Sequence, residues 1–176
     1  MLTISVENVG AERGMIIVLD DVQKPTKAAI VYQGRLMHYT QLQLESILQE
    51  GLAGWVVHKY QPVLVTDTSK DPRWLHRPDD DADQSGAKSA VCLPILLTGN
   101  VLVGVITIVY PQPGFFTEEH LKLLQAIADQ AAIAIYNAHL YQSLEIAHLR
   151  YRELFEDSIN PIIISDWEGK IIESNR

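Results

Sequence analysis

Short apolar runs separated by polar turns make up the first part of the chain. Residues 15–20 are dense in β-branched side chains, and residues 27–33 form a second run of the same kind. A polar turn with a proline lies between the two runs, and Gly34 follows the second. β-Branched runs bounded by turn residues are typical of strands, so this pattern predicts a β-hairpin.

The next stretch, residues 35–50, has no single period. Residues 41–44 alternate between polar and apolar as in a strand, whereas Leu42, Ser46 and Gln49 fit the beginning of a helix. Both interpretations stay open at this point. Further along, residues 52–60 have the pattern of a short helix that ends before Pro62, and residues 62–66 have that of a compact strand.

Two long apolar runs, residues 89–97 and 101–110, are joined by a tight turn at residues 98–100. Strands that are buried on both faces have continuous apolar runs, so both are predicted to be central in the sheet. The segment before them, residues 67–88, is rich in Asp, Pro, Gly and Ser. We expect it to form a long loop, of the length that is usually functional or disordered.

A single long helix is predicted from Thr117 to about Asp157, because this stretch contains neither proline nor glycine. Roughly forty helical residues are about 60 Å long, and Thr117 is a suitable N-cap. The apolar positions form two stripes roughly 150° apart. The first stripe, expected to pack on the sheet, consists of Leu121, Leu124, Ala128, Ala131, Ile135 and Ala138. The second, expected to project and to pair with a second copy of the chain, consists of Leu140, Leu144, Ala147, Tyr151 and Leu154.

The chain after this helix is predicted to form a hairpin. Pro161 cannot continue a helix, and residues 162–173 read as two strands around a turn at Glu168 and Gly169. A lone two-stranded hairpin is marginally stable in water. We therefore expect it to be the beginning of a further domain.

Composition narrows the classes of partner. The net charge is −8 and the isoelectric point about 5.1, without a Lys/Arg cluster that reverses the charge locally, so neither nucleic acid nor a membrane surface is expected as a partner. The longest apolar run, residues 101–110, is too short to span a bilayer, which takes about twenty residues. A single cysteine, Cys92, fits a reducing cytoplasmic location.

An ordered set of sequence blocks within residues 2–142 resembles the GAF domain family. The resemblance implies an α+β, PAS-related fold: a six-stranded antiparallel sheet with helices on both faces and a long C-terminal helix. The blocks are Val9–Asp20, Gly51–Val56, Pro62–Asp67, Asp71–Trp74, Ser89–Ile95, Val103–Ile106, Phe116–Glu119 and Ala128–Asn137.

The last residues, 155–176, resemble the first two strands of a PAS domain through Ser158, Asn160, Pro161, Asp166, Gly169 and Asn175. Together the two resemblances imply a GAF domain at 1–138, a projecting signalling helix at 139–158 and a truncated PAS hairpin at 159–176. This series is usual in bacterial sensor histidine kinases. The chain is thus expected to be a piece of a longer cytoplasmic protein, possessing no catalytic residues of its own. Two alternatives stay open: a ligand-free structural dimerisation module, and the input domain of a diguanylate cyclase or phosphodiesterase.

The reactive side chains of the sequence all fit simple structural roles. Cys92 lies mid-strand between apolar residues without a basic neighbour, so it is expected to be a buried structural thiol. The six histidines lack ligand spacing. Residues 81–86 begin like a calcium loop, but position twelve is Cys92 instead of glutamate, so a solvated loop is expected. No metal and no cofactor are therefore predicted. The family resemblance also implies a comparison with the few GAF-fold proteins that reduce free methionine sulfoxide with cysteines of the lid loop. Residues 67–90 contain no cysteine, so this activity is not expected.

The family geometry implies where a small molecule would bind. Its pocket would lie between the sheet and the segments around Trp55 and residues 67–89. The side chains proposed for it are Trp55, Asp67, Arg73, Trp74 and Val91. The simpler alternative is that both tryptophans belong to the core and that Arg73 pairs with Asp71 or Asp67.

Overall fold

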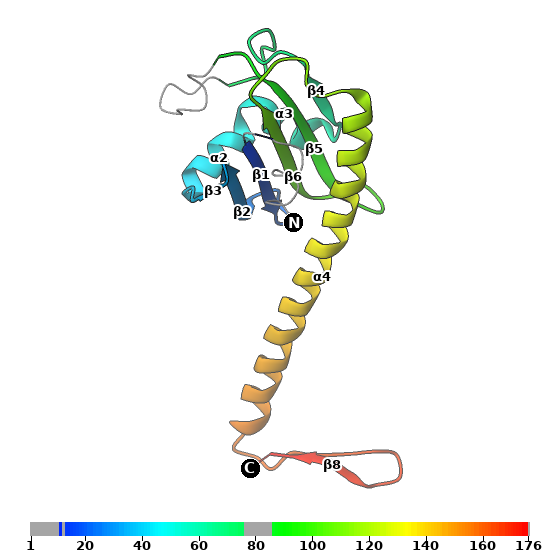
Figure 1. Cartoon of the computed structure of the whole chain (residues 1–176). Coiled ribbons are helices and arrows are strands. Elements are labelled where there is room, and N and C mark those ends of the chain that lie inside the picture. The colour runs from blue at the N-terminus through cyan, green and yellow to red at the C-terminus, as the bar shows by residue number, and fades with distance from the viewer. Residues whose placement is uncertain (1–10, 12, 76–85, 176) are drawn as a thin grey trace. The chain divides into compact units, whose positions relative to one another are not determined.

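A six-stranded antiparallel sheet organises the first part of the chain. The computed structural model describes residue 11, residues 13–75 and residues 86–175, and within them the strands are ordered β3-β2-β1-β6-β5-β4 (Figure 1). The strands are β1 (Arg13–Leu19), β2 (Pro25–Tyr32), β3 (Arg35–Met37), β4 (Val63–Val65), β5 (Ser89–Leu97) and β6 (Val101–Tyr110). The predicted sheet and the hairpin of β1 with β2 are thereby confirmed.

The two continuous apolar runs occupy inner positions of this sheet, as predicted. Strand β6 pairs with β1 on one side and β5 on the other, and β5 also pairs with β4. The turn between β5 and β6 places Gly99 and Asn100 at positive φ, 84° and 61°. Glycine and asparagine tolerate this left-handed region best, which explains the tight connection.

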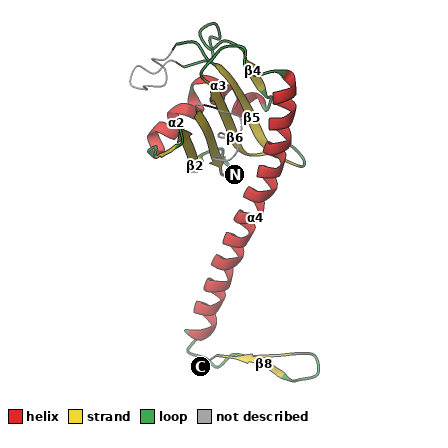
Figure 2. Cartoon of the chain, viewed as in Figure 1, coloured by secondary structure: helices red, strands yellow, loops and turns green. Residues whose placement is uncertain are grey.

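Helices cover both faces of the sheet. Helices α2 (Gln41–Gln49) and α3 (Gly51–Lys59) pack on one face, and the first part of α4 (Glu118–Glu156) packs on the other (Figures 1 and 2). Because side chains alternate across a strand, neighbouring residues enter different cores. In β6, for example, Val105 and Val109 belong to the α2–α3 core, whereas Ile106 and Ile108 belong to the α4 core.

The ambiguous stretch at 35–50 contains both a strand and a helix. Residues 35–37 form β3, and α2 begins at Gln41 because Thr40 caps it. The Thr40 backbone N–H donates to Gln43 Oε1 at 2.8 Å, and the Gln43 N–H donates to Thr40 Oγ1 at 3.4 Å. This reciprocal capping box satisfies two backbone donors that a helix otherwise leaves unpaired. The capping pattern thus decides for a helix over the strand-like alternation of residues 41–44.

Helix α4 begins at the predicted cap. The His120 N–H donates to Thr117 Oγ1 at 3.4 Å, and the Thr117 N–H donates to His120 Nδ1 at 3.2 Å. The predicted first stripe packs on the sheet up to Ile135, with Leu124 and Ala128 buried. Ala138, the last position of that stripe, is exposed instead. The first compact unit is Met1–Ile135.

The second compact unit is Tyr136–Arg176. It contains the rest of α4 and a two-stranded sheet of β7 (Ile163–Ser165) and β8 (Ile171–Ser174), which confirms the predicted hairpin. In its turn the N–H groups of Glu168 and Lys170 both donate to Asp166 Oδ1, at 3.0 and 2.9 Å. No helix in the described ranges is both long enough and apolar enough to cross a membrane.

Candidate ligand pocket

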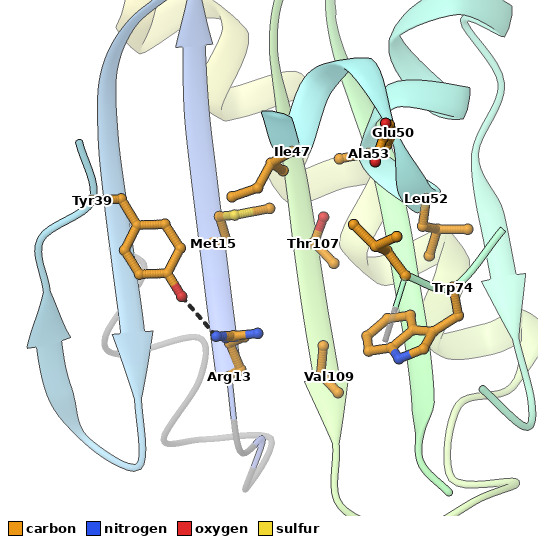
Figure 3. A pocket seen from close by; sticks show the side chains of 11 residues that line it. Arg13, Met15, Tyr39, Ile47, Glu50, Leu52, Ala53, Trp74, Thr107 and Val109 are labelled. Atoms are coloured by element: carbon orange, nitrogen blue, oxygen red, sulfur yellow. Dashed lines mark hydrogen bonds between the residues drawn. The ribbon is translucent and has the colours of Figure 1, made fainter. Parts of the chain in front are cut away.

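A pocket lies on the α2–α3 face of the sheet (Figure 3). The volume open to the centres of water molecules is about 80 Å³. One water occupies roughly 10–15 Å³ of such volume, so the pocket holds roughly five to eight water positions. The lining residues are Arg13, Met15, Tyr39, Ile47, Glu50, Leu52, Ala53, Trp74, Leu75, Thr107 and Val109.

Two paired strands supply the floor of the pocket. In the register of β1 with β6, Arg13 lies opposite Val109 and Met15 lies opposite Thr107. Directly opposed residues of antiparallel strands share a face, so these four side chains form one block beneath α2 and α3. Val109 and Met15 are nearly fully buried, and Thr107 is 7% exposed. The floor is therefore apolar except for one guanidinium and one hydroxyl.

Two tyrosines position the Arg13 side chain. The Arg13 Nη2 donates to the Tyr39 hydroxyl oxygen at 2.8 Å, as the dashed line in Figure 3 marks. The guanidinium carbon also lies 5.8 Å from the ring centroid of Tyr32, the residue opposite Arg13 in β2.

The remaining polar groups come from three different elements. The Thr107 Oγ1 lies 3.2 Å from the Cys92 Sγ, in the neighbouring strand. Glu50, at the junction of α2 and α3, is exposed and lies apart from Arg13 in Figure 3. Trp74 lies in the loop after β4, where its backbone N–H donates to the Asp71 carbonyl oxygen at 3.0 Å. An apolar cavity with a few polar groups in its lining is typical of small-molecule sites.

The predicted site residues Trp55 and Arg73 form a separate cluster with Asp71. The Arg73 guanidinium carbon lies 4.8 Å from the Trp55 ring centroid, which is a cation–π contact. Its Nε and Nη2 donate to the two carboxylate oxygens of Asp71 at 2.9 and 2.7 Å. These hydrogen bonds lower the pKa of Asp71 and raise that of Arg73. Arg73 is thus paired with Asp71, the simpler of the two roles considered for it.

Asp67, also predicted for the site, closes a local turn. Its Oδ1 accepts from the N–H of Ser69 at 3.0 Å and from the Ser69 hydroxyl at 2.6 Å, and its Oδ2 lies 3.0 Å from the Lys70 ammonium. The hydrogen bond from the Ser69 side chain lowers the pKa of Asp67 most, followed by that from Lys70. Asp67 and Arg73 line a second, more open hollow beside β4 instead of the pocket.

Val91 lies on the opposite face of the sheet, which corrects its predicted grouping with Trp55 and Trp74. Its neighbours in β5, Ala90 and Cys92, enter the α2–α3 core, whereas Val91 is fully buried in the core under α4. The alternation of the strand decides this, because successive side chains point to opposite faces. Of the five predicted residues, only Trp74 is among the described residues that line the pocket.

Cys92 is buried, as predicted. Burial raises the pKa of its thiol to about 12. Among the residues that the structure describes, no group of three or more His, Cys, Asp or Glu side chains is placed to hold a metal ion. The acidic loop at 81–86 lies outside the described residues.

Sequence reasoning missed four polar lining residues: Arg13, Tyr39, Glu50 and Thr107. Two of them carry a recognisable signal, because Arg13 begins an apolar strand and Thr107 interrupts one. A polar residue within such a run indicates a polar contact inside the fold. The identity of that contact depends on which strands are neighbours, and the pairing of β1 with β6 places Arg13 opposite Val109 and Met15 opposite Thr107, each more than ninety positions away in the sequence.

Comparisons with known proteins agree with this fold. The family model for the GAF domain matches residues 1–135. A Caenorhabditis elegans protein described as a 3′,5′-cyclic phosphodiesterase, pde-5, is 23% identical over 182 residues, with 94% of this chain and 25% of that protein covered. The chain thus spans about a quarter of the length of that relative, and less of the other curated relatives it matches.

Two solved structures are similar in fold. The GAF domain of a phosphoenolpyruvate-protein phosphotransferase from Coxiella burnetii is 21% identical, with a TM-score of 0.59 and coverage of 81% of this chain and 82% of that one. A domain described as part of a two-component sensor histidine kinase from Sinorhizobium meliloti is 14% identical, with a TM-score of 0.53 and coverage of 82% and 92%. At these identities the similarity establishes the fold alone.

Proposed function

The chain belongs to the GAF domain family, and from this premise we propose that it is the sensory module of a signal-transduction protein. In this proposal a small molecule binds in the pocket between the sheet and α2–α3, and α4 passes the signal on. The observation that carries the proposal is the pocket itself, in which Arg13, Tyr39, Glu50 and Thr107 place polar side chains in a mainly apolar lining.

Strand β6 offers a short route from the pocket to α4. Thr107 and Val109 line the pocket, whereas the residues between and before them, Ile108 and Ile106, pack in the same core as Leu124 and Ala128 of α4. A ligand that shifts β6 therefore changes the packing under α4 directly. Because close-packed cores deform little, such a shift is passed on to the helix instead of being absorbed.

The second proposed element of the mechanism is a homodimer through α4. Leu140, Leu144, Ala147, Tyr151 and Leu154 are spaced by alternating steps of four and three residues, the heptad spacing of a coiled coil. Leu144 and Leu154 are 67% and 77% exposed, so this seam has apolar surface for a second copy. We name these five residues the α4 seam. Rotation or sliding of the seam would carry the signal to the next domain.

The parent protein that we propose is a cytoplasmic sensor histidine kinase. The chain spans a minor part of its curated relatives, so an output domain would lie beyond it. The hairpin of β7 and β8 at the end of the chain supports the proposal, since it matches the expected beginning of a PAS domain at 159–176. The alternative is the input domain of a diguanylate cyclase or phosphodiesterase. Of these two parent proteins, the similarity to pde-5 favours the phosphodiesterase.

Mass spectrometry of the purified chain under native conditions tests ligand binding. We expect a small molecule to co-purify, and its mass difference to vanish on denaturation. The variant Ala53→Leu, which fills the pocket from α3, should release it, whereas Lys59→Leu on the exposed surface of the same helix should retain it. An unliganded protein, together with no thermal shift from any compound of a metabolite library, would contradict the proposal.

A ligand-free dimerisation module is the second candidate function. The volume of about 80 Å³ favours it, because pockets for drug-sized ligands measure about 300–1,000 Å³. On this alternative Ala53→Leu fills the cavity and leaves dimerisation and signalling unchanged. The same variant therefore separates the two functions.

A further inference from the structure

The heptad spacing of the α4 seam continues toward the N-terminus of α4. Steps of three and four residues alternate without interruption from Leu123 to Leu154, and every side chain at these positions is exposed. The side chains that pack on the sheet in the first compact unit, such as Ala128 and Ile135, lie on the opposite side of the helix. We name the α4 seam, together with the five positions that precede it, the extended seam. These five positions are Leu123, Ala126, Gln130, Ile133 and Asn137.

The added length makes the extended seam a surface for a second helix. The α4 seam by itself covers two heptads, from Leu140 to Leu154, whereas a coiled coil is indicated by heptad spacing over three to four heptads or more. The extended seam covers more than four heptads and is roughly 46 Å long at about 1.5 Å per residue. It also gains Leu123 and Ile133, which are 58% and 52% exposed. A second copy of this chain has the matching surface.

Two amide side chains interrupt the apolar spacing of the extended seam. The heptad positions that face a partner helix are a and d, and Leu123 is at position a because the next step is three residues. Leucine at a with isoleucine at d, as at Ile133, favours trimers and tetramers. Gln130 and Asn137 are also at a, where a polar residue selects register and oligomer state at a cost in stability. Given the α4 dimer proposed above, we propose that these two amides restrict α4 to a parallel, in-register pair of two copies.

The residues that oppose each other favour the parallel arrangement. In a parallel, in-register pair Asn137 meets Asn137 of the second copy, and an amide both donates and accepts hydrogen bonds. In an antiparallel pair that spans the same residues, position a faces position d. Asn137 would then lie opposite Leu140, and Gln130 opposite Ala147, so both amides would be buried without a partner. A parallel pair shifted by one heptad also places an Asn137 opposite a leucine, Leu144.

Charged side chains beside the seam favour the opposite arrangement only weakly. Ion pairs between the flanking positions e and g influence orientation in coiled coils. From Ile127 to Phe155 these positions hold one acid, Asp129, and one base, Arg150. The two would meet in an antiparallel pair, but an exposed ion pair contributes little, whereas a buried amide without a partner costs more. The two amides therefore determine the orientation.

Sedimentation equilibrium of the full chain tests the role of the amides. The variant Gln130→Leu/Asn137→Leu should associate at least about tenfold more tightly than the unmodified chain and reach a mass above that of a dimer. Ala138→Leu/Gln142→Leu adds the same two leucines at exposed positions b and f, on the outer side of the helix, and should remain a dimer. If Gln130→Leu/Asn137→Leu also remains a dimer, or associates more weakly, the amides do not select the oligomer.

Disulfide cross-linking tests the parallel order and the extension into the first unit. Ala126 is at position d, so Ala126→Cys should cross-link to its counterpart in at least about half of the dimers after mild oxidation. An antiparallel pair would place the two cysteines roughly 37 Å apart. Ala138→Cys, also exposed but at position b, is the control and should not cross-link. Cys92 is buried and does not interfere. Equal cross-linking of the two variants would overturn the parallel extended seam.

These outcomes differ from those that would contradict the proposed function. An unmodified chain that is monomeric at every concentration overturns the α4 dimer and this inference with it. A dimer that Leu144→Glu dissociates, but that Ala126→Cys does not cross-link, keeps the α4 dimer and overturns the extended seam alone. Ligand binding in the pocket is measured separately and depends on neither result.

Discussion

Thr107 shows at the residue scale how one polar side chain serves both the core and the pocket. Its Oγ1 lies 3.2 Å from the Cys92 Sγ, in the register position directly opposite in β5. Cys92 belongs to the α2–α3 core, and Thr107 lines the pocket beside it. Burial raises the pKa of Cys92 to about 12, and the hydrogen bond with Thr107 opposes this rise. The thiol therefore remains protonated at neutral pH.

Cys92 is accordingly expected to resist alkylation. Its pKa of about 12 compares with an ordinary value of 9.0, so its thiolate is about a thousandfold rarer in the folded chain at pH 8. We predict that iodoacetamide modifies the native protein at least about a thousandfold more slowly than the chain in urea. Intact mass spectrometry over time measures both rates. Equal rates in the two conditions would show that Cys92 is accessible in the folded state.

Asp71 is expected to make stability depend on pH in the acid range. The hydrogen bonds from Arg73 depress its pKa below the ordinary 3.8, so its contribution is present above that value and is lost as pH falls through the lower folded pKa. Asp71→Asn should reduce the free energy of unfolding by about 1 kcal/mol at pH 7, as for a partly exposed pair. The free energies of unfolding of the variant and of the unmodified chain should become equal at pH values below the pKa of Asp71 in both the folded and the unfolded chain.

Urea unfolding followed by tryptophan fluorescence measures this difference, and Trp55 beneath the Arg73 guanidinium reports on the same cluster. Asp21→Asn, in the exposed turn between β1 and β2, is the matched control and should have no effect. A difference for Asp71→Asn that persists unchanged at acid pH would mean that packing, and not the ion pair, stabilises the cluster.

The site residues were harder to predict than the strands that carry them. Runs and turns in the sequence correctly predicted β1, β2, β5 and β6, because local periodicity reports burial. Arg13 lies at the site because β1 pairs with β6 and β2, which places it opposite Val109 and Tyr32. Val91 lies on the other face of the sheet because side chains alternate along β5. Both facts depend on long-range register, which no local pattern contains.

At the scale of elements, the contact of α2 with α3 shapes the wall of the pocket. Gly54 in α3 lies so close to the end of α2 that a Cβ on it would lie 2.6 Å from the Leu48 carbonyl oxygen. The ends of the two helices meet at Glu50, whose N–H donates to the Ser46 carbonyl oxygen. Ile47, Leu52 and Ala53 of these helices line the pocket. The approach of the helices therefore determines the width of the pocket.

Gly54→Ala is expected to destabilise the fold, although alanine is the better helix former by about 1 kcal/mol. The new methyl group cannot lie 2.6 Å from a backbone oxygen, so α2 must move, which costs about 1–3 kcal/mol. Thermal unfolding measures the effect, and Lys59→Ala at the exposed end of α3 is the control. A more stable Gly54→Ala variant would show that propensity outweighs the close approach.

Element boundaries were predictable where capping residues were recognised. Thr117 predicted the beginning of α4 correctly, since it accepts from the N–H of His120. Thr40 plays the same role for α2 through Gln43, but the strand-like alternation of residues 41–44 concealed it. The first stripe of α4 was predicted through Ala138, whereas Ala138 is exposed. A regular helix continues its spacing whether or not a sheet lies beneath it, so periodicity alone does not show where packing ends.

At the scale of the whole molecule, the exposed α4 seam is the strongest reason to expect a dimer. Tyr151 is partly engaged within its own unit, because its ring lies 5.5 Å from that of Phe155 and its hydroxyl donates to Glu173 Oε2 at 2.9 Å. Leu140, Leu144 and Leu154 remain at least half exposed. Three leucines in heptad positions bury most of their apolar surface when two parallel helices pair.

Leu144→Glu is therefore predicted to weaken self-association at least about a hundredfold, because a dimer would bury two like charges at the centre of the seam. Sedimentation equilibrium of both proteins over a range of concentrations measures the dissociation constant. Gln142→Glu adds the same charge two residues away, on a different face of the helix, and should leave the constant unchanged. Circular dichroism should show the same helix content in the three folded proteins at concentrations where the unmodified chain is dimeric. An unmodified chain that remains monomeric throughout the range would contradict the dimer and, with it, the proposed route of the signal through α4. If Leu144→Glu and Gln142→Glu weaken association equally, net charge and not the apolar seam governs pairing.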